Sequence, residues 1–223
     1  MTTVYMFNQY ASYPGVPGST RHYNLARELA RQGIDVYIFS SNFSHMLKSR
    51  IRDVNGPYLI ETVDGVNYVR MNTFGYFHND WRRVVNMLDY ARKSYGIAKD
   101  LSRKGIAPDV VIGTVAHPFS VASARFTAKK LGARFFIDIG DLWPDVFVTS
   151  GKMTERHPVY VTVGKTMTWF YEKAEKIICL TDEARSYFKG RGYGHKTILL
   201  PPGIRLDGTP PSMPAPASGG TFR

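Results

Sequence analysis

The stretch Tyr13-Pro14-Gly15-Val16-Pro17-Gly18-Ser19-Thr20-Arg21-His22 decides the fold of this chain. A short apolar run at 4–7 precedes it, and an apolar pattern at helical spacing follows it and ends at Gly33. The order strand, Gly/Pro loop, helix places backbone N–H groups and the positive end of a helix at the carboxyl edge of a sheet. Because α/β folds bind ligands at that edge, we expect a binding crevice around this loop.

The rest of the chain alternates between strand and helix patterns. Continuous apolar runs, which suit strands buried on both faces, lie at 34–40, 108–113, 134–138, 176–180 and 196–200. Helical spacing of apolar residues is found at 81–104, 118–131, 158–174 and 182–189. An Asp64-Gly65 turn joins two further strands at 58–63 and 66–70. The sequence therefore predicts an α/β, Rossmann-like, doubly wound and mostly parallel sheet.

Charge and composition restrict the classes of partner. The chain of 223 residues carries a formal charge of +11, which implies nucleic acid, an anionic membrane surface or a phosphorylated substrate as partner. Nucleic acid is not expected, because no known nucleic-acid-binding motif is present. The single cysteine, Cys179, excludes an internal disulfide and favours a reducing, cytoplasmic setting. No signal peptide and no membrane-spanning run is recognisable, so we expect any membrane contact to be peripheral.

The Gly/Pro loop does not match the common nucleotide-binding motifs. The dinucleotide fingerprint requires G-x-G-x-x-G and a carboxylate after the second strand, whereas the second predicted strand ends without one at 39–42. Arg21 and His22 add two cations to the first helical turn, where they oppose the helix dipole. An anionic ligand would reverse that balance. The alternative is a plain turn with Arg21 facing solvent or paired with Glu28, and the residues alone leave both interpretations open.

Four segments in order carry a resemblance to a known family. Residues 15–36 resemble the opening of the family 4 retaining glycosyltransferases of GT-B fold, and above all the bacterial colanic acid and O-antigen transferases (WbuB/WcaI-like). The other matching segments are Ala116-His117-Pro118-Phe119, residues 138–145 with their Asp-Leu-Trp-Pro motif, and residues 201–207. Each segment alone is weakly specific, whereas the four in order form a strong match over residues 3–207.

The resemblance implies a two-domain enzyme with its active site between the domains. Residues 1–206 would be the N-terminal acceptor-binding domain, and residues 207–223 a Pro/Gly-rich linker or disordered tail. The resemblance implies sugar transfer from a nucleotide-sugar to a glycan or polyprenyl-linked acceptor in surface polysaccharide biosynthesis, with no metal or other cofactor. Because the donor-binding domain is not seen in the sequence, we expect this chain alone to be inactive. The alternative is a non-catalytic binding module that complements a separately encoded donor-binding subunit.

Candidate site residues follow from the matched segments and from chemistry. The resemblance implies that His117 reaches the sugar or acceptor, and the alternative is that it caps the helix beginning at Pro118. Asp141 could accept a proton from an acceptor hydroxyl, or Asp141 or Asp145 could cap a following short helix. Trp143 could form a wall against a sugar. The loop residues expected to bind substrate are Gly15, Gly18, Ser19, Arg21 and His22.

The helical segment 81–104 suggests a membrane surface. It holds seven basic and two acidic side chains. Arg92, Lys99 and Arg103 fall on one flank, beside the apolar stripe, in a layout that suits a helix lying on anionic lipid. The alternative is a core helix with a solvated basic face. We therefore expect a cytoplasmic protein that can associate peripherally with the inner face of the cell membrane.

Overall fold

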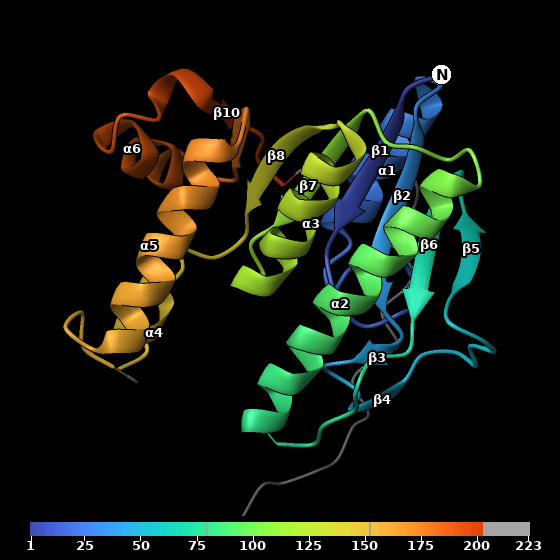
Figure 1. Ribbon diagram of the computed structural model, residues 1–223, viewed down its shortest axis with the longest axis horizontal. Helices are drawn as coiled ribbons and strands as arrows, with labels where there is room; N and C mark the ends of the chain where they lie inside the picture. The colour runs from blue at the N-terminus through green and yellow to red at the C-terminus, as the bar shows by residue number, and fades with distance from the viewer. Residues whose placement is uncertain (79, 152, 203–223) are drawn as a thin grey trace, which may run out of the picture.

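The computed structural model describes residues 1–78, 80–151 and 153–202, and Figure 1 shows the arrangement of its elements. Eight strands form one sheet in the order β10-β9-β8-β7-β1-β2-β6-β5, and every neighbouring pair is parallel except β5 with β6. The strands are β1 (Thr3–Phe7), β2 (Asp35–Ser41), β5 (Leu59–Val63), β6 (Val66–Met71), β7 (Val110–Thr114), β8 (Arg134–Ile139), β9 (Lys176–Cys179) and β10 (Thr197–Leu199). This confirms the predicted Rossmann-like, doubly wound and mostly parallel sheet.

The helices cover both faces of the sheet. In Figure 1, α2 and α3 lie in front of it and α1 lies behind it. The helices are α1 (Arg21–Arg31), α2 (Trp81–Arg103), α3 (Pro118–Leu131), α4 (Asp145–Thr149), α5 (Pro158–Lys173) and α6 (Asp182–Gly190), with a 3₁₀ turn, η1, at Gly194–Lys196. The small antiparallel pair β3 (Phe43–Ser44) and β4 (Ser49–Arg50) was not predicted from the sequence, whereas α4 is the short helix expected near Asp145.

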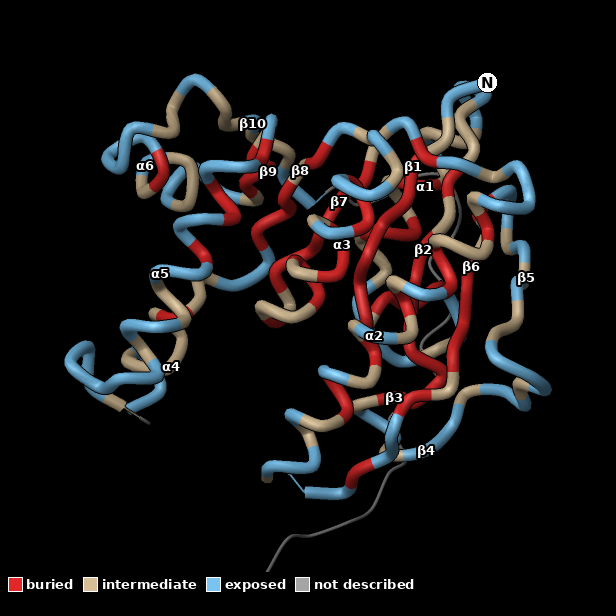
Figure 2. The backbone as a smooth tube through the Cα atoms, in the orientation of Figure 1, coloured by how far each residue is buried: buried red, intermediate tan, exposed pale blue. Residues whose placement is uncertain are grey.

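Two apolar cores follow from the alternation of side chains along the central strand. Tyr5 and Phe7 of β1 point into the core beneath α2 and α3, whereas Val4 and Met6 point into the core beneath α1. Figure 2 shows the buried central strands between the helical layers. Burial on both faces explains why the strand sequences are continuously apolar rather than alternating.

The strand order places a crevice at the carboxyl ends of β1 and β7. The chain moves outward from β1 to β2 and β6, and α2 then carries it back to β7 on the other side of β1. This reversal is the topological switch point at which open α/β sheets bind ligands. The loop of residues 8–20, which contains most of the decisive stretch 13–22, leaves β1 at this point.

The helix ends are capped by side chains or by glycine at some positions and not at others. Asp80 accepts a hydrogen bond from the Arg82 N–H as N-cap of α2, and Gly132 ends α3 in the left-handed conformation. By contrast, the Thr20 side chain makes no capping hydrogen bond at α1. The domain boundary predicted at 206 and the predicted linker at 207–223 lie outside the described residues.

Candidate functional site

A cleft of about 380 Å³ occupies the predicted crevice. Its walls come from the segment after β1, the Gly/Pro loop, the first turn of α1, the β3–β4 turn, α2 and the carboxyl ends of β7 and β8. Lining residues used below are Tyr10, Gly18, Ser19, Arg21, His22, His45, Met46, Arg83, Thr114, Asp138 and Asp141. Five of the predicted site residues therefore meet in one cleft: Gly18, Ser19, Arg21, His22 and Asp141.

Glycine is required at one of the two predicted loop positions for steric reasons. Gly18 has φ +144°, and a Cβ atom added there would lie 2.8 Å from the Ser12 Cβ. Gly15 has φ +89°, but no atom lies within 4 Å of the position its Cβ would take. Gly15 shapes the turn but does not line the cleft, so the structure separates two glycines that the sequence treated alike.

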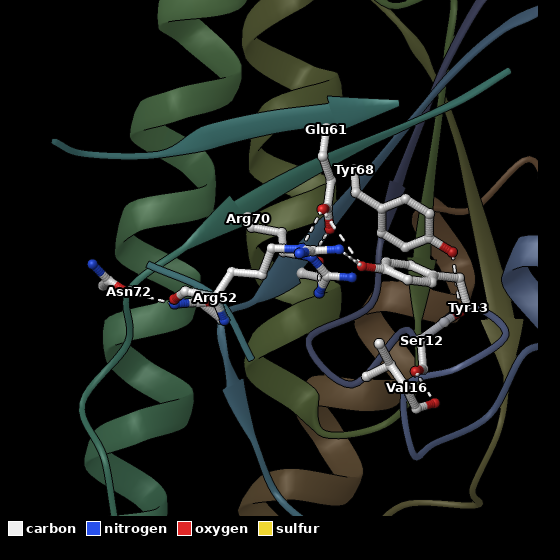
Figure 3. Close-up of polar contacts among 10 residues, drawn as sticks. Ser12, Tyr13, Val16, Arg52, Glu61, Tyr68, Arg70 and Asn72 are labelled. Carbon is white, nitrogen blue, oxygen red and sulfur yellow. Dashed lines mark hydrogen bonds and ion pairs between the residues drawn. The ribbon is translucent and has the colours of Figure 1, made fainter. Parts of the chain in front are cut away.

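The loop is held by a partly buried polar network, which Figure 3 shows. The Tyr68 hydroxyl donates to the Ser12 carbonyl at 3.0 Å, and Arg52 donates to the Tyr13 hydroxyl at 3.0 Å. Arg52 and the fully buried Arg70 both pair with Glu61. The Gly/Pro loop is thus tied to β5 and β6, which fixes the position of its far end at the cleft.

A buried ion pair joins the first turn of α1 to β8. Arg21 Nη1 lies 2.8 Å from Asp138 Oδ2, and His22 Nε2 lies 3.0 Å from the same oxygen. Burial alone would raise the pKa of Asp138, but His22 and Arg21 outweigh it and hold that pKa below its usual value. The alternative partner expected for Arg21 was wrong, because Glu28 pairs with Arg31 instead.

The hydrogen-bond network fixes the tautomer of His22. Asn8 Oδ1 accepts from the Tyr10 N–H, so Asn8 Nδ2 is the donor to His22 Nδ1 at 2.9 Å. Nδ1 is therefore unprotonated, and Nε2–H points to Asp138, with Thr114 Oγ1 as a second acceptor at 2.8 Å. His22 consequently positions the Asp138 carboxylate from within the protein.

Two polar atoms of this cluster are left without a protein partner. Arg21 Nη2 and Asp138 Oδ1 are both buried, and neither makes a hydrogen bond among the described residues. Both side chains line the cleft. An unmade hydrogen bond on a buried polar group costs about 1–3 kcal/mol. A ligand hydroxyl could satisfy both atoms, because it accepts one hydrogen bond and donates another.

His117 lies beneath the cleft rather than in it. Its Nδ1 accepts from the Ser120 N–H at 3.2 Å as N-cap of α3, and its Nε2 lies 2.7 Å from Gln9 Oε1. The side chain is fully buried, and burial, followed by the charge of Arg83, lowers its pKa to about 3. The capping alternative is confirmed as a structural role. A part for His117 in the reaction stays a prediction.

Asp141 and Trp143 occupy different environments. Asp141 lines the mouth of the cleft, and burial raises the pKa of its carboxyl while Arg83 opposes the rise. Trp143 lies outside the cleft lining and packs edge-on against Phe147 at 4.8 Å. The predicted capping of α4 is wrong, because its N-cap makes no side-chain hydrogen bond. Asp145 instead accepts hydrogen bonds from the Tyr160 and Tyr187 hydroxyls.

Two residues that line the cleft and carry charge, Asp138 and Arg83, were not among the predicted site residues. Asp138 lies in the segment 138–145, from which Asp141 and Trp143 were predicted instead. The sequence feature that could have identified Asp138 as a site residue is its position at the end of a buried strand. Arg83 was counted with the basic residues of α2, although its position in the first turn directs it to the carboxyl edge. No sequence pattern pairs Arg21 with Asp138, because 117 positions separate them.

The three cations predicted to face a membrane lie on the outer side of α2. Arg92 pairs with Asp89 at 3.3 Å, and the Lys99 ammonium lies over the Tyr95 ring. The apolar stripe along this half of the helix, Tyr90, Ile97, Ala98 and Leu101, is buried in the core. Exposed apolar side chains gather at the opposite end of α2, at Trp81, Val84 and Leu88.

Among the helices of residues 1–78, 80–151 and 153–202, none combines the length and the apolarity needed to cross a bilayer.

Comparisons with solved structures support the fold. The chain is similar to sucrose-phosphate synthase from Thermosynechococcus elongatus at 13% identity and a TM-score of 0.64, covering 90% of this chain and 48% of that one. It is also similar to the calicheamicin glycosyltransferase CalG4, at 14% identity, a TM-score of 0.56 and coverages of 96% and 56%. UGT89C1 from Arabidopsis thaliana, solved with UDP, matches at 12% identity and a TM-score of 0.57, with coverages of 93% and 51%.

These likenesses concern the fold, and the chain spans about half the length of each of these structures. A search of curated proteins found no match. The model of one protein family, described as Glycosyltransferase Family 4, matches residues 18–207, which include the Gly18–Arg21 wall of the cleft and both partners of the buried ion pair. The chain therefore belongs to Glycosyltransferase Family 4.

Proposed function

We propose that this chain is the acceptor-binding half of a retaining glycosyltransferase. The enzyme moves a sugar from a nucleotide-sugar to a glycan or polyprenyl-linked acceptor in bacterial surface polysaccharide biosynthesis. No metal or other cofactor takes part, and the chain is inactive by itself. UGT89C1, a structure of similar fold, was solved with UDP, which supports a nucleotide-sugar as donor. A finer placement, among transferases of the colanic acid and O-antigen type, rests on the segment 138–145.

The pair of unpartnered atoms at Arg21 and Asp138 is the observation that carries this proposal. One buried donor and one buried acceptor, on two ion-paired side chains that line the cleft, fit the hydroxyl of a neutral sugar. The charge of Arg21 is already balanced by Asp138, so an anion gains little there. Asp141 at the cleft mouth provides a carboxylate that can take the proton of an attacking acceptor hydroxyl. His117 supports this wall through Gln9.

Saturation-transfer NMR with a panel of methyl glycosides and their monodeoxy analogues tests acceptor binding. We expect millimolar binding of at least one glycoside, loss of binding when one hydroxyl is deleted, and loss in the Asp138→Asn variant. Arg31→Lys, in an exposed ion pair, is the control and should bind normally. No binding by any glycoside would refute the acceptor role. Product formed by this chain alone from nucleotide-sugars and lipid-linked acceptors would refute its inactivity.

A membrane surface beside the cleft completes the proposal. Phe77 and Trp81 are 74% and 64% exposed, which is unusual for large apolar side chains without a partner. The β3–β4 turn adds Met46 and Leu47, and Met46 also lines the cleft. We define the apolar rim as Met46, Leu47, Phe77, Trp81 and Leu88. With a chain charge of +11, this rim suits an anionic bilayer that presents a lipid-linked acceptor at the cytoplasmic face.

Vesicle co-sedimentation tests the membrane surface. We expect the chain to bind phosphatidylglycerol vesicles and not phosphatidylcholine vesicles, and the double variant Trp81→Ser, Leu88→Ser to bind at least tenfold less. Phe126→Ser, an equally exposed aromatic on α3, is the matched control. Replacing Arg92, Lys99 and Arg103 by glutamine tests the basic flank separately. If the double variant binds the vesicles as well as the unmodified chain does, the apolar rim is not the membrane-binding surface.

A further inference from the structure

The part of the cleft formed by the first turn of α2 and the β3–β4 turn holds cations without carboxylate partners among the described residues. Arg83 lines this part together with His45, and Lys48 Nζ lies 3.2 Å from His45 Nδ1. Among the described residues, neither Arg83 nor Lys48 forms an ion pair with a carboxylate. Arg83 Nε is buried and donates to no atom of the described residues.

The uncompensated positive charge shifts the pKa values of neighbouring groups. Burial, Lys48 and Arg83 together lower the pKa of His45, and burial followed by Arg83 lowers that of Lys48. The same guanidinium opposes the burial-driven rise in the pKa values of Tyr10, Tyr76 and Asp141. A lysine whose pKa is lowered by a neighbouring guanidinium lies in a region of excess positive charge, which a negative charge would relieve. Asp141 does not supply it, since it forms no ion pair with Arg83.

The geometry suits a phosphate group better than a carboxylate or a halide. A guanidinium with a free Nε–H can offer a fork of two donors to tetrahedral oxygens, and an ammonium adds a point charge beside it. Arg83 also lies in the first turn of α2, a helix of 23 residues, whose N-terminus favours negative charge. The tethering of Lys48 over the Tyr76 ring and of His45 to the Tyr76 hydroxyl keeps this wall in place.

We propose that Arg83, with Lys48 and His45, binds the phosphate or diphosphate group of a substrate in the part of the cleft formed by the first turn of α2 and the β3–β4 turn. This inference rests on the proposed function for its substrate class, but the site itself follows from Arg83, whose Nε has no hydrogen-bond partner and whose charge has no carboxylate partner among the described residues. Two substrates of that function carry such a group: the nucleotide-sugar and a lipid-linked acceptor. The apolar rim begins at Met46 in the same wall, so a prenyl chain attached to the phosphate could leave the cleft along it.

Calorimetric titration of the chain with inorganic pyrophosphate tests the site. We expect Arg83→Gln to weaken pyrophosphate binding at least tenfold and Arg83→Lys, which keeps the charge and loses the fork, to weaken it about threefold. Arg82→Gln is the matched control: it removes the same charge one residue away, from an exposed side chain paired with Asp80, and should change affinity less than twofold. Thermal unfolding of each variant verifies that it is folded.

Equal losses in Arg82→Gln and Arg83→Gln would overturn the proposal, since binding would then reflect net charge alone. Absence of any pyrophosphate binding would overturn it too. Parallel titrations with UDP and with farnesyl diphosphate show which substrate supplies the phosphate group. The ligand that binds more tightly, and whose binding depends on Arg83, indicates whether a nucleotide or a lipid phosphate occupies the site. Glycoside binding that persists while pyrophosphate binding fails would leave the acceptor role standing and remove only this inference.

Discussion

Arg21 and Arg83 occupy equivalent positions in the fold, but only Arg21 is paired with a carboxylate among the described residues. Each lies in the first turn of a helix at the carboxyl edge of the sheet, and each lines the same cleft. A cation there opposes the helix dipole and needs a negative partner. Arg21 receives one from β8, as Asp138, whereas Arg83 receives none among the described residues. Arg21 is therefore part of a neutral ion pair in the wall of the cleft, whereas the charge of Arg83 is not compensated by the described residues.

The difference divides the cleft by chemistry. A balanced ion pair with one free donor and one free acceptor selects hydroxyl groups, and repels additional anions through its carboxylate. An unbalanced guanidinium beside an ammonium attracts phosphate. A glycosylated phosphate has both kinds of group, so the two regions together describe one substrate class.

Asp138→Asn should have the largest effect on stability. It leaves the nearly buried Arg21 without a counter-charge, which costs about 3 kcal/mol of unfolding free energy at pH 7. Because the pKa of folded Asp138 lies below its unfolded value, this contribution is present above about pH 4 and is lost as pH falls through the folded pKa. Urea unfolding at several pH values measures it. A loss as small as that of Glu175→Gln, in an exposed pair with Arg134, would contradict the account.

His117 should make the chain sensitive to mild acid. The folded state keeps His117 neutral to about pH 3, whereas the unfolded state protonates it below about pH 6.5. The unfolded state binds the extra proton, so stability falls as pH is lowered from 6.5, by up to about 1.4 kcal/mol per pH unit. His117→Asn replaces the capping Nδ1 by a capping amide oxygen and should flatten this slope. An unchanged slope in the variant would show that another group dominates.

The loop glycines should differ although both have positive φ. Gly18→Ala meets the Ser12 side chain in a conformation that alanine avoids, and should cost about 2 kcal/mol. Gly15→Ala meets no atom and should cost about 1 kcal/mol, for its backbone conformation alone. Only Gly18→Ala should also weaken glycoside binding, since Gly18 lines the cleft. Equal effects on stability and binding would contradict this separation.

The smallest effect concerns His45. Removing the Arg83 charge in Arg83→Gln should raise the pKa of His45 toward its usual value, because Arg83 is one of the charges that lower it. Arg82→Gln should leave it unchanged. NMR titration of the imidazole signals measures both. A pKa of His45 that does not respond to Arg83→Gln would place the guanidinium farther from the β3–β4 turn than the structure does.

The sequence predicted the fold well because the fold depends on local patterns. Continuous apolar strands, helix spacing and Gly/Pro punctuation are all readable over short windows, as at β1, α3 and Gly132. The site was predicted in part: the loop, His22 and Asp141 follow from position after a strand. The Arg21–Asp138 pair, the lack of a partner for Arg83 and the burial of His117 depend on which distant residues meet across the sheet, and no local pattern contains that information.

Titrating two ligands into two variants tests whether the cleft has one region for hydroxyl groups and another for phosphate. Methyl glycoside and pyrophosphate would each be titrated into the unmodified chain, Asp138→Asn and Arg83→Gln. The account predicts that Asp138→Asn loses the glycoside and keeps or gains pyrophosphate affinity, because Arg21 is released, while Arg83→Gln loses pyrophosphate and keeps the glycoside. Loss of the same ligand in both variants, with both proteins folded, would contradict a cleft with one neutral and one cationic region.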